Sequence, residues 1–458
     1  KYGITQNMTA DLTVNTDFAQ VEADEQQVNL TRFSLFFPEK RDFFLENQGT
    51  FAFGGLAATA ASSSDAPSLF YSRRIGFNRN REVPLEVGGR LTGRAGKFTV
   101  GALNMQTGDD EKSGSKATNF SVLRLKRDIL RRSSVGVIFT GRSVAQSGEG
   151  TNQAYGADGT FSFFQNLTIN TYWAQTRTDG VPGDDDTSYR AQLDYPGDRY
   201  GLQVEHLAIG ANFNPEVGFV RRKDMVREFG SFRFSPRPRA SRRIRRYSYT
   251  GSVDYIENGS GRVETREREA EFAVEFQNAD RFSLTYTNTY DFLPGPFDIA
   301  TGVTLPVGGY DYDNAKITFN MGQQRRLSFN VAAEYGTYYN GHKTTVGASR
   351  GRMNVSSQLS IEPTYTVNRV ELVEGSFTTH LTGTRVVYTM TPLMFTSALV
   401  QYNSGSRAIS ANIRLRWEYR PGSELFVVFN TERNTLGPGF SQLSNRSLIV
   451  KINRLFRV

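Results

Sequence analysis

The feature that most constrains the fold of this chain is an alternation of apolar and polar side chains with a period of two residues. In residues 408–419 the odd positions are apolar or aromatic, whereas the even positions carry Arg414, Arg416 and Glu418. Successive side chains of a β-strand point to opposite faces, so this stretch predicts a strand with one apolar and one charged face. The same pattern recurs in residues 263–276, 282–287 and 327–335.

Short turn sequences alternate with longer, irregular connections between these stretches. The longer connections cover residues 107–116, 178–187, 207–224, 293–309 and 434–445. Short turns on one rim and long loops on the other are typical of outer-membrane β-barrels, whose strands need about 9 to 11 residues to cross. Counting turns predicts about 20 strands between residues 84 and 433, one over about 446–457 and at least one N-terminal strand. The expected total is about 22, within a range of about 20 to 24.

Composition excludes several other classes of protein. Hydrophobic residues make up 38% of the 458 residues and mean hydropathy is -0.45, and the absence of any run of about eighteen apolar residues excludes a bundle of transmembrane helices. Cysteine is absent, which excludes disulfides, thiolate metal sites and cysteine nucleophiles. The net charge is +8, but both signs are spread along the chain, unlike a nucleic-acid-binding stripe.

These patterns predict an all-β fold, a closed antiparallel transmembrane β-barrel that forms a single domain over residues 1–458 in the bacterial outer membrane. Closure removes the unpaired strand edges of an open sheet. A soluble propeller or β-helix would also alternate, but the sequence shows no internal repeat of about 20 to 50 residues. Because Lys1 opens directly into polar sequence, we expect a mature or trimmed chain that has lost its signal peptide.

Residues 17–66 depart from the alternation. Their most irregular part, residues 36–46, wedges charged side chains between aromatic ones, which suits neither lipid nor a simple strand. Large barrels commonly hold a plug in their wide lumen, so we predict that this N-terminal segment folds inward as a plug or constriction. The alternative is a pair of irregular wall strands with an outer loop.

Aromatic residues lie where the two rims of a barrel belong. Tyr335, Tyr338 and Tyr339 follow the turn at residues 323–324 by about one membrane crossing, which predicts an outer aromatic girdle. Trp417 lies just before the short turn at residues 421–422, at the opposite rim.

Several stretches resemble a known bacterial family. They are DLTVNTDFAQVEAD at 11–24, NLTRF at 29–33, FPEKR at 37–41, LFYSRRIG at 69–76, FNPEVGFVRR at 213–222 and RWEYRPGSEL at 416–425. The family is a barrel domain of unknown function that usually follows a carbohydrate-binding, family-9-like β-sandwich. The resemblance implies an outer-membrane location and, where the sandwich is present, a link to glycans. The sandwich is not in this sequence, and the family supplies no catalytic residues.

Charged residues on the polar faces of the strands are the candidate lumen residues. Facing rows of opposite charge order water and favour polar or zwitterionic solutes. The alternative is that they are wall ion pairs that keep a plug or lumen hydrated. The candidates are Glu267, Glu269, Glu271, Glu275, Glu334, Arg414, Arg416 and Glu418.

A dense arginine patch lies on a connection that the strand count assigns to the periplasmic rim. It contains Arg237, Arg239, Arg242, Arg243, Arg245 and Arg246. Binding to lipid phosphates is the simplest interpretation, and docking of a periplasmic partner is the alternative. Nucleic acid is disfavoured because no stacking platform or recognition helix accompanies the patch.

Two further motifs have weak chemical meaning. Asp184, Asp185 and Asp186 form an acidic loop that could hold Ca²⁺ through carboxylate oxygens, although it lacks EF-hand spacing; a solvated loop or one that bridges lipopolysaccharide is the alternative. Residues 347–351 match the G-x-S-x-G pattern of hydrolases, which requires a strand-to-helix elbow and a nearby histidine. The context here is strand, so we predict no enzyme activity and no cofactor.

The sequence therefore predicts a channel or transporter for hydrophilic, glycan-related solutes. The competing hypothesis is a non-conducting structural or interaction barrel that anchors surface or periplasmic partners. The expected partners are outer-membrane lipid and lipopolysaccharide, with a glycan or a periplasmic or surface protein, and no nucleic acid.

Overall fold

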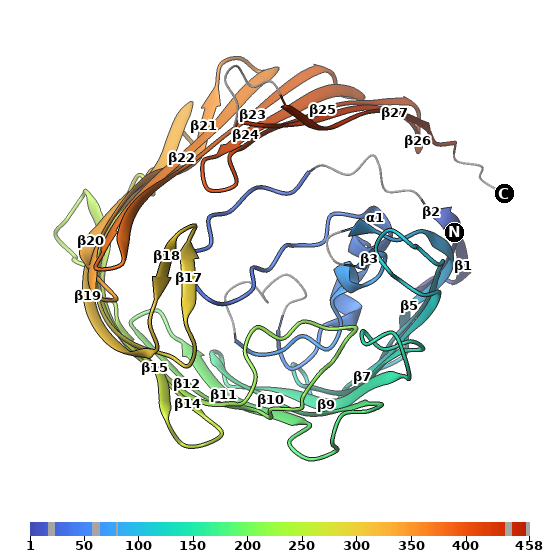
Figure 1. The fold of residues 1–458 in the computed structure, drawn as a ribbon, viewed down its shortest axis with the longest axis horizontal. Helices are drawn as coiled ribbons and strands as arrows, with labels where there is room; N and C mark the ends of the chain where they lie inside the picture. Colours follow the sequence, from blue (N-terminus) through green and yellow to red (C-terminus); the bar gives the residue numbers. More distant parts are fainter. Residues whose placement is uncertain (17–22, 57–64, 79–80, 436–441, 455–458) are drawn as a thin grey trace. The chain divides into compact units, whose positions relative to one another are not determined.

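The computed structural model describes residues 1–16, 23–56, 65–78, 81–435 and 442–454 (Figure 1). Its described secondary structure is almost entirely strand, with the short helix α1 (Asp42–Leu45) and the 3-10 turns η1 (Gln48–Phe51) and η3 (Ser72–Arg74). No helix in this part of the chain is long and apolar enough to cross a membrane. The prediction of an all-β chain is confirmed.

The strands of the first half of the chain follow one another at short intervals. They are β1 (Tyr2–Thr5), β2 (Met8–Thr16), β3 (Phe77–Asn78), β4 (Arg81–Glu82), β5 (Leu85–Ala95), β6 (Phe98–Thr107), β7 (Thr118–Asp128), β8 (Ser134–Arg142), β9 (Asn152–Phe163), β10 (Leu167–Thr178), β11 (Thr187–Pro196), β12 (Tyr200–Ile209) and β13 (Met225–Phe234).

The strands of the second half are on average longer. They are β14 (Ile244–Asn258), β15 (Val263–Phe276), β16 (Arg281–Leu293), β17 (Phe297–Ala300), β18 (Val303–Leu305), β19 (Gly308–Asn320), β20 (Leu327–Tyr338), β21 (Gly341–Asn354), β22 (Leu359–Leu372), β23 (Gly375–Thr391), β24 (Met394–Asn403), β25 (Ala408–Arg420), β26 (Ser423–Asn434) and β27 (Gln442–Ile452).

Within the described residues, 23 strands belong to one sheet, and β3–β4 and β17–β18 form separate two-stranded hairpins. The strand number lies inside the predicted range. The strands β5–β16 and β19–β26 correspond to those predicted between residues 84 and 433. The four-residue strand β1 pairs with β2, and the sequence pattern did not predict it as a separate strand. Closure of the sheet into a barrel stays a prediction.

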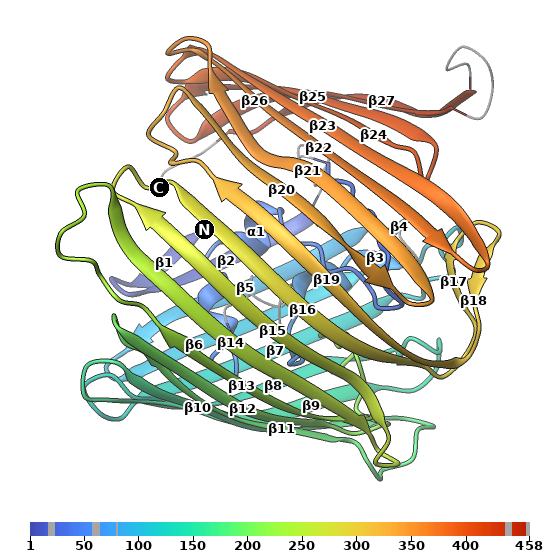
Figure 2. The same ribbon diagram turned by 90° about the vertical axis from the view of Figure 1, so that its left-hand side faces the viewer.

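The chain divides into two compact units: unit 1 holds residues 1–18, 33–232 and 253–264, and unit 2 holds residues 19–32, 233–252 and 265–458. In unit 1, β2 pairs with β1 and β5, and the strands from β5 to β12 each pair antiparallel with the next. In unit 2, β15 pairs with β16, β16 with β19, and the strands from β19 to β27 each with the next (Figure 2). Pairing between neighbours in sequence is what short turns produce.

In unit 1 the two faces of the sheet differ in burial. On β7, Val122 and Arg124 are buried, whereas the intervening Leu123 and the following Leu125 are 54% and 42% exposed. The buried set contacts residues 33–56 and 65–78 and is called here the inner face of unit 1. The exposed apolar set is its outer face.

Unit 2 shows the same division. On β16, Ser283, Thr289 and Asp291 are buried, whereas Leu284 and Tyr286 are exposed. The face that holds Asp291 contacts residues 24–32 and is called the inner face of unit 2.

Residues 33–56 and 65–78 run across the inner face of unit 1 instead of extending its sheet, as the blue segment around α1 shows in Figure 1. Phe44 and Phe51 pack with Met105 and Phe120 in one buried cluster, and Phe53 packs against Tyr172 in a second. The described part of 17–66 contains no strand, while residues 17–22 and 57–64 lie outside the described residues. The role of 17–66 as a plug of a lumen stays a prediction.

The expected aromatic girdle is wrong for two of its three residues. Tyr335 is 62% exposed on the outer face, but Tyr338 and Tyr339 are each only 7% exposed. They pack with Leu293 and Val370 in a cluster with the β17–β18 hairpin. Tyr338 is three residues from Tyr335, so the strand places it on the inner face, and Tyr339, in the left-handed region with a φ of 49°, packs in the same cluster.

Candidate functional site

The inner face of unit 1 is held to the N-terminal segment by buried ion pairs. Arg90 on β5, with a side chain 1% exposed, donates from Nε to Asp11 Oδ2 at 3.2 Å and from Nη2 to Glu46 Oε2 at 3.0 Å. Nη1 of the same guanidinium donates to the carbonyls of Phe43 and Glu46. One arginine thus ties β2, β5 and the region of α1 together.

A second group of ion pairs centres on the backbone of Gly54. Arg124 on β7 makes a bidentate pair with Asp158 on β9, at 2.7 and 2.9 Å. The same carboxylate accepts a hydrogen bond from the Gly54 amide at 3.0 Å, and Arg190 donates to the Gly54 carbonyl at 3.1 Å. Gly54 has a φ of 66°, and a Cβ there would lie 2.6 Å from the Tyr172 ring, so both conformation and space require glycine.

The same line of charges continues into β12, β13 and β14. Arg190 pairs with Glu205 at 3.0 Å, and Arg227 donates to Glu205 at 2.6 Å and to Asp254 at 2.8 and 2.7 Å. Buried charges are stable only when paired and hydrogen-bonded. The charges of this face are therefore used in packing the N-terminal segment.

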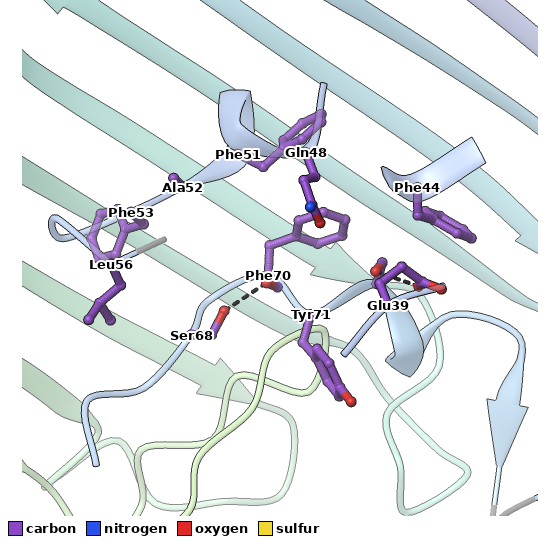
Figure 3. A pocket seen from close by; sticks show the side chains of 11 residues that line it. Glu39, Phe44, Gln48, Phe51, Ala52, Phe53, Leu56, Ser68, Phe70 and Tyr71 are labelled. Atoms are coloured by element: carbon purple, nitrogen blue, oxygen red, sulfur yellow. Dashed lines mark hydrogen bonds between the residues drawn. The ribbon is translucent and has the colours of Figure 1, made fainter. Parts of the chain in front are cut away.

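A small cavity of about 30 Å³ lies between the segment around α1 and residues 68–72 (Figure 3). At its edge Glu39 accepts hydrogen bonds from Arg41 at 2.7 to 2.9 Å and from Ser72 at 2.6 Å. Burial raises the pKa of Glu39, but the hydrogen bonds and charge of Arg41 and the Ser72 hydroxyl outweigh it, so the pKa lies below its ordinary value. The cavity is large enough for a water molecule and too small for a solute.

The connection between β12 and β13 also folds onto this region. Phe219 and Ser68 exchange backbone hydrogen bonds at 2.8 and 2.9 Å, and Phe213 and Val217 are fully buried. Glu216 accepts a hydrogen bond from the amide of Gln146 at 2.6 Å. Burial raises the pKa of Glu216, although this hydrogen bond and the charge of Arg142 act in the opposite direction.

In unit 2 the predicted glutamates of β15 lie in register with the inner face of β16. Glu267 lies opposite Thr289, Glu269 opposite Thr287 and Glu271 opposite Thr285. Glu271 pairs with Arg281 at 2.5 Å. The partner of Glu271 is on the neighbouring strand β16, which is the arrangement of a wall ion pair.

Glu275 connects the predicted lumen residues to the arginine patch. It pairs with Arg245 at 3.0 Å and with Arg246 at 2.9 Å, both from the arginine patch. Arg237, Arg239, Arg242 and Arg243 lie between or beside the ends of β13 and β14 and are exposed. The patch therefore divides into two arginines on β14 and four on the connection.

The remaining predicted lumen residues lie on β20 and β25. Glu334 pairs with Lys343 at 2.8 Å, Arg416 donates to Glu424 at 2.7 Å, and Glu418 accepts a hydrogen bond from the Gly422 amide at 2.8 Å. Arg414 lies opposite Ser397 and Val428, on the same side as these two. The role of the β15 and β25 groups in a lumen stays a prediction.

Residues 24–32 form an extended strap across the inner face of unit 2, visible in Figure 1 as the blue strand-free trace. Gln401 accepts a hydrogen bond from the Gln26 amide at 2.8 Å and donates to the Asp24 carbonyl at 3.1 Å. Tyr338 donates to the Leu30 carbonyl at 2.7 Å. These contacts anchor the strap to β24 and β20.

Below the strap lies a cavity of about 300 Å³ on β21 to β24. Its lining combines polar and charged side chains with the apolar Leu381 and Leu399. The residues that define it are Glu25, Gln323, Arg350, Arg352, Glu362, Thr364, Gly383, Arg385 and Gln401. Arg385 pairs with Glu25 at 2.9 Å.

The acidic loop and the hydrolase-like motif are not assembled into sites. Asp186 accepts hydrogen bonds from Gln175 at 2.9 and 3.1 Å, while Asp184 contacts Asn212. Across the ranges that the structure describes, no three acidic or histidine side chains gather as metal ligands. Residues 347–351 lie on β21, without the helix that a nucleophile elbow needs.

Sequence reasoning missed the arginines of unit 1 and of the cavity. Arg90, Arg124 and Arg190 share a face of their strands with other charged residues, such as Arg94, Lys126 and Asp194. Alternation therefore assigns them to a polar face but does not show that they are buried. Arg350 and Arg352 follow the small residues of the 347–351 motif and could not be assigned to a face by alternation alone.

Two comparisons of sequence bear on the family. Residues 1–89 match a family described as a domain of unknown function (DUF5916), which covers part of β5 and the chain before it. No curated protein matches the sequence.

Three solved structures align with most of this chain at low sequence identity and with TM-scores below 0.4. The open form of the ferric-catecholate import receptor Fiu from E. coli K12 matches with a TM-score of 0.37 and 8% identity, covering 81% of this chain and 72% of that chain. The copper transporter OprC has a TM-score of 0.36 at 12% identity, with 82% and 70% covered. The ferric yersiniabactin uptake receptor FyuA from Yersinia pestis has a TM-score of 0.34 at 9% identity, with 81% and 69% covered.

Proposed function

We propose that this chain is an outer-membrane β-barrel that lets hydrophilic solutes cross the membrane. The observation that carries the proposal is the opposite character of the two faces in each unit. Outer-face positions expose large apolar side chains along successive strands, which fits contact with lipid. Examples are Leu123, Val137, Trp173, Val204, Leu284, Ile317, Val331, Val400, Ile413 and Leu448.

Closure of the sheet follows from the same proposal. In hydrocarbon an unpaired strand edge leaves backbone amides and carbonyls unsatisfied, at a cost of several kcal/mol per group. A sheet of 23 strands avoids this cost when its first and last strands meet. The proposed lumen is then lined by the inner faces.

The chemistry of the inner face of unit 2 supports hydrophilic cargo. It carries both signs of charge, such as Glu271 with Arg281 and Glu334 with Lys343, and charged walls of this kind select polar solutes. Glycan-related solutes are the first class that we propose to test, because the family resemblance links such barrels to a carbohydrate-binding domain. The exposed arginines at the β13–β14 connection would meet lipid phosphates.

A second candidate function is a non-conducting interaction barrel. The observation that favours it is the coverage of the inner face of unit 1 by residues 33–56 and 65–78, with Arg90 and Arg124 buried in ion pairs. If the lumen is filled in this way, the loops and rims are the surfaces that remain for binding partners.

Single-channel recording in planar bilayers separates these two functions. Purified full-length protein that migrates as a heat-modifiable barrel is added to one side of the bilayer. We expect discrete conductance steps that depend on salt concentration. Repeated insertion without any steps, verified by protease protection of the inserted protein, would support the interaction barrel instead.

A further inference from the structure

We propose that the cavity below the strap binds a small hydrophilic solute through a carboxylate group. This inference rests on the proposed function, since it names the class of solute that the barrel would recognise. The cavity measures about 300 Å³, which is the lower end of the size of small-molecule sites. Three arginines and two glutamates line it, so the lining has one positive charge in excess.

Arg350 carries the positive charge that no carboxylate of the lining pairs with, so it is available to a ligand. It lines the cavity, and within the described chain its guanidinium makes no hydrogen bond or ion pair. The other two arginines already have carboxylates nearby. Arg352 lies 3.9 Å from Glu362, and Arg385 lies 2.9 Å from Glu25 and 4.0 Å from Glu362.

The backbone at Arg350 is shaped to present this side chain. Between Ala348 and Met353 the register of β21 against β22 shifts, because β21 has one more residue than its partner there. Arg350 has a φ of 48°, in the left-handed region that favours glycine over a long side chain. Bulges and strained residues of this kind cluster at sites where a side chain is redirected for function.

The surrounding groups fit a hydroxylated carboxylate. A guanidinium offers two parallel N–H donors that match the two oxygens of a carboxylate. Gln323 contributes an amide that has no hydrogen bond within the described chain. At Gly383 a Cβ would lie 2.7 Å from Thr364 Oγ1, so glycine keeps the floor of the cavity open.

The test is a binding measurement on the full chain in detergent, where a conducting pore is not needed. Isothermal titration calorimetry with D-glucuronate is compared with D-glucose, which has the same ring and no carboxylate. The variant is Arg350→Gly, which removes the guanidinium and suits the positive φ. The matched control is Arg407→Gly, because Arg407 has the same φ of 48° and is exposed on the β24–β25 turn outside the cavity.

We expect glucuronate to bind at least tenfold more tightly than glucose, and Arg350→Gly to weaken glucuronate binding at least tenfold. Arg407→Gly should bind as the unchanged chain does. Equal binding of the two sugars, equal loss in both variants, or unchanged binding by Arg350→Gly would overturn the proposal. Tighter binding of inorganic phosphate than of glucuronate would overturn the carboxylate assignment.

The outcomes separate this site from the proposed function. Glucuronate binding without any conductance would leave the site standing and refute transport. Conductance without glucuronate binding would leave transport standing and refute the site.

Discussion

The inner faces of the two units are built from the same alternating strands but are covered in different ways. In unit 1 residues 33–56 and 65–78 cover the inner face with aromatic clusters, and arginines such as Arg124, whose side chain is 1% exposed, are buried beneath them. In unit 2 the described chain covers the inner face less completely, with the extended strap of residues 24–32 and the β17–β18 hairpin. Arginines such as Arg281, 45% exposed, remain accessible.

The composition of the inner positions explains the difference. Inner positions of unit 1 include Leu103, Met105 and Phe120, which can bury aromatic rings of the N-terminal segment. Inner positions of β15 and β25 are mostly charged or amide side chains, such as Glu271 and Arg416, which retain water. Alternation therefore fixes which face is polar or apolar, while the size and polarity of individual inner residues decide whether that face is filled.

The largest expected effect is the loss of a buried ion pair in unit 1. Arg124→Ala leaves Asp158 buried with only the Gly54 amide as a partner, and breaking such a pair costs about 3 to 5 kcal/mol. Arg281→Ala removes an exposed pair of unit 2 and should cost about 0 to 1 kcal/mol. Urea unfolding in lipid vesicles measures both. Equal losses would show that the two inner faces are equally buried.

The outer face should respond to charge in both units alike. Val331→Arg places a charge on a residue that is 42% exposed on the outer face of β20, and such substitutions cost about 2 to 4 kcal/mol near mid-membrane. Asn330→Arg, one residue away on the inner face, should be tolerated. The same refolding assay checks this, and identical behaviour of the two variants would refute the assignment of faces.

The strap of unit 2 should be held more weakly than the segment of unit 1. Gln401→Ala removes two hydrogen bonds to the strap, each worth about 1 kcal/mol. We expect faster hydrogen–deuterium exchange at residues 24–30 and no change at residues 41–54. Gln323→Ala, which alters the cavity without touching the strap, is the control, and faster exchange in that variant would contradict the anchoring role of Gln401.

The smallest expected effect is a pH dependence of the stability of unit 1, caused by two buried glutamates whose pKa values are shifted in opposite directions. The pKa of Glu39 is lowered, so its stabilising contribution is present at neutral pH and is lost as the pH falls through that lowered value. The pKa of Glu216 is raised, so the folded state gains stability as the pH falls through it. Urea titrations at several pH values, with Glu39→Gln and Glu216→Gln compared with the unchanged chain, should show differences that change in opposite directions. Parallel changes would contradict this account.

The all-β fold, the strand number and the alternation of faces could be predicted from the sequence, because a strand repeats its environment every two residues. The coverage of the inner faces could not, since it depends on contacts between distant residues, such as Arg190 with Gly54 and Gln401 with Gln26. The cavity depends on a register shift near Arg350, which leaves no signature in the pattern. Tyr338 was misplaced because it has the opposite parity to Tyr335 and lies on the inner face. The packing of Tyr338 and Tyr339 with the hairpin of residues 297–305 is a contact between distant residues, beyond local pattern reading.

Cysteine labelling tests the contrast between the two inner faces most directly, because the chain has no cysteine of its own. Single cysteines are placed at Lys316 on the inner face of unit 2, at Thr140 on the inner face of unit 1, and at Ile317 on the outer face. In protein inserted into lipid vesicles, a charged, membrane-impermeant maleimide should react with Lys316→Cys, and not with Thr140→Cys or Ile317→Cys. Equal labelling of Lys316→Cys and Thr140→Cys would contradict the account, as would labelling of Ile317→Cys alone.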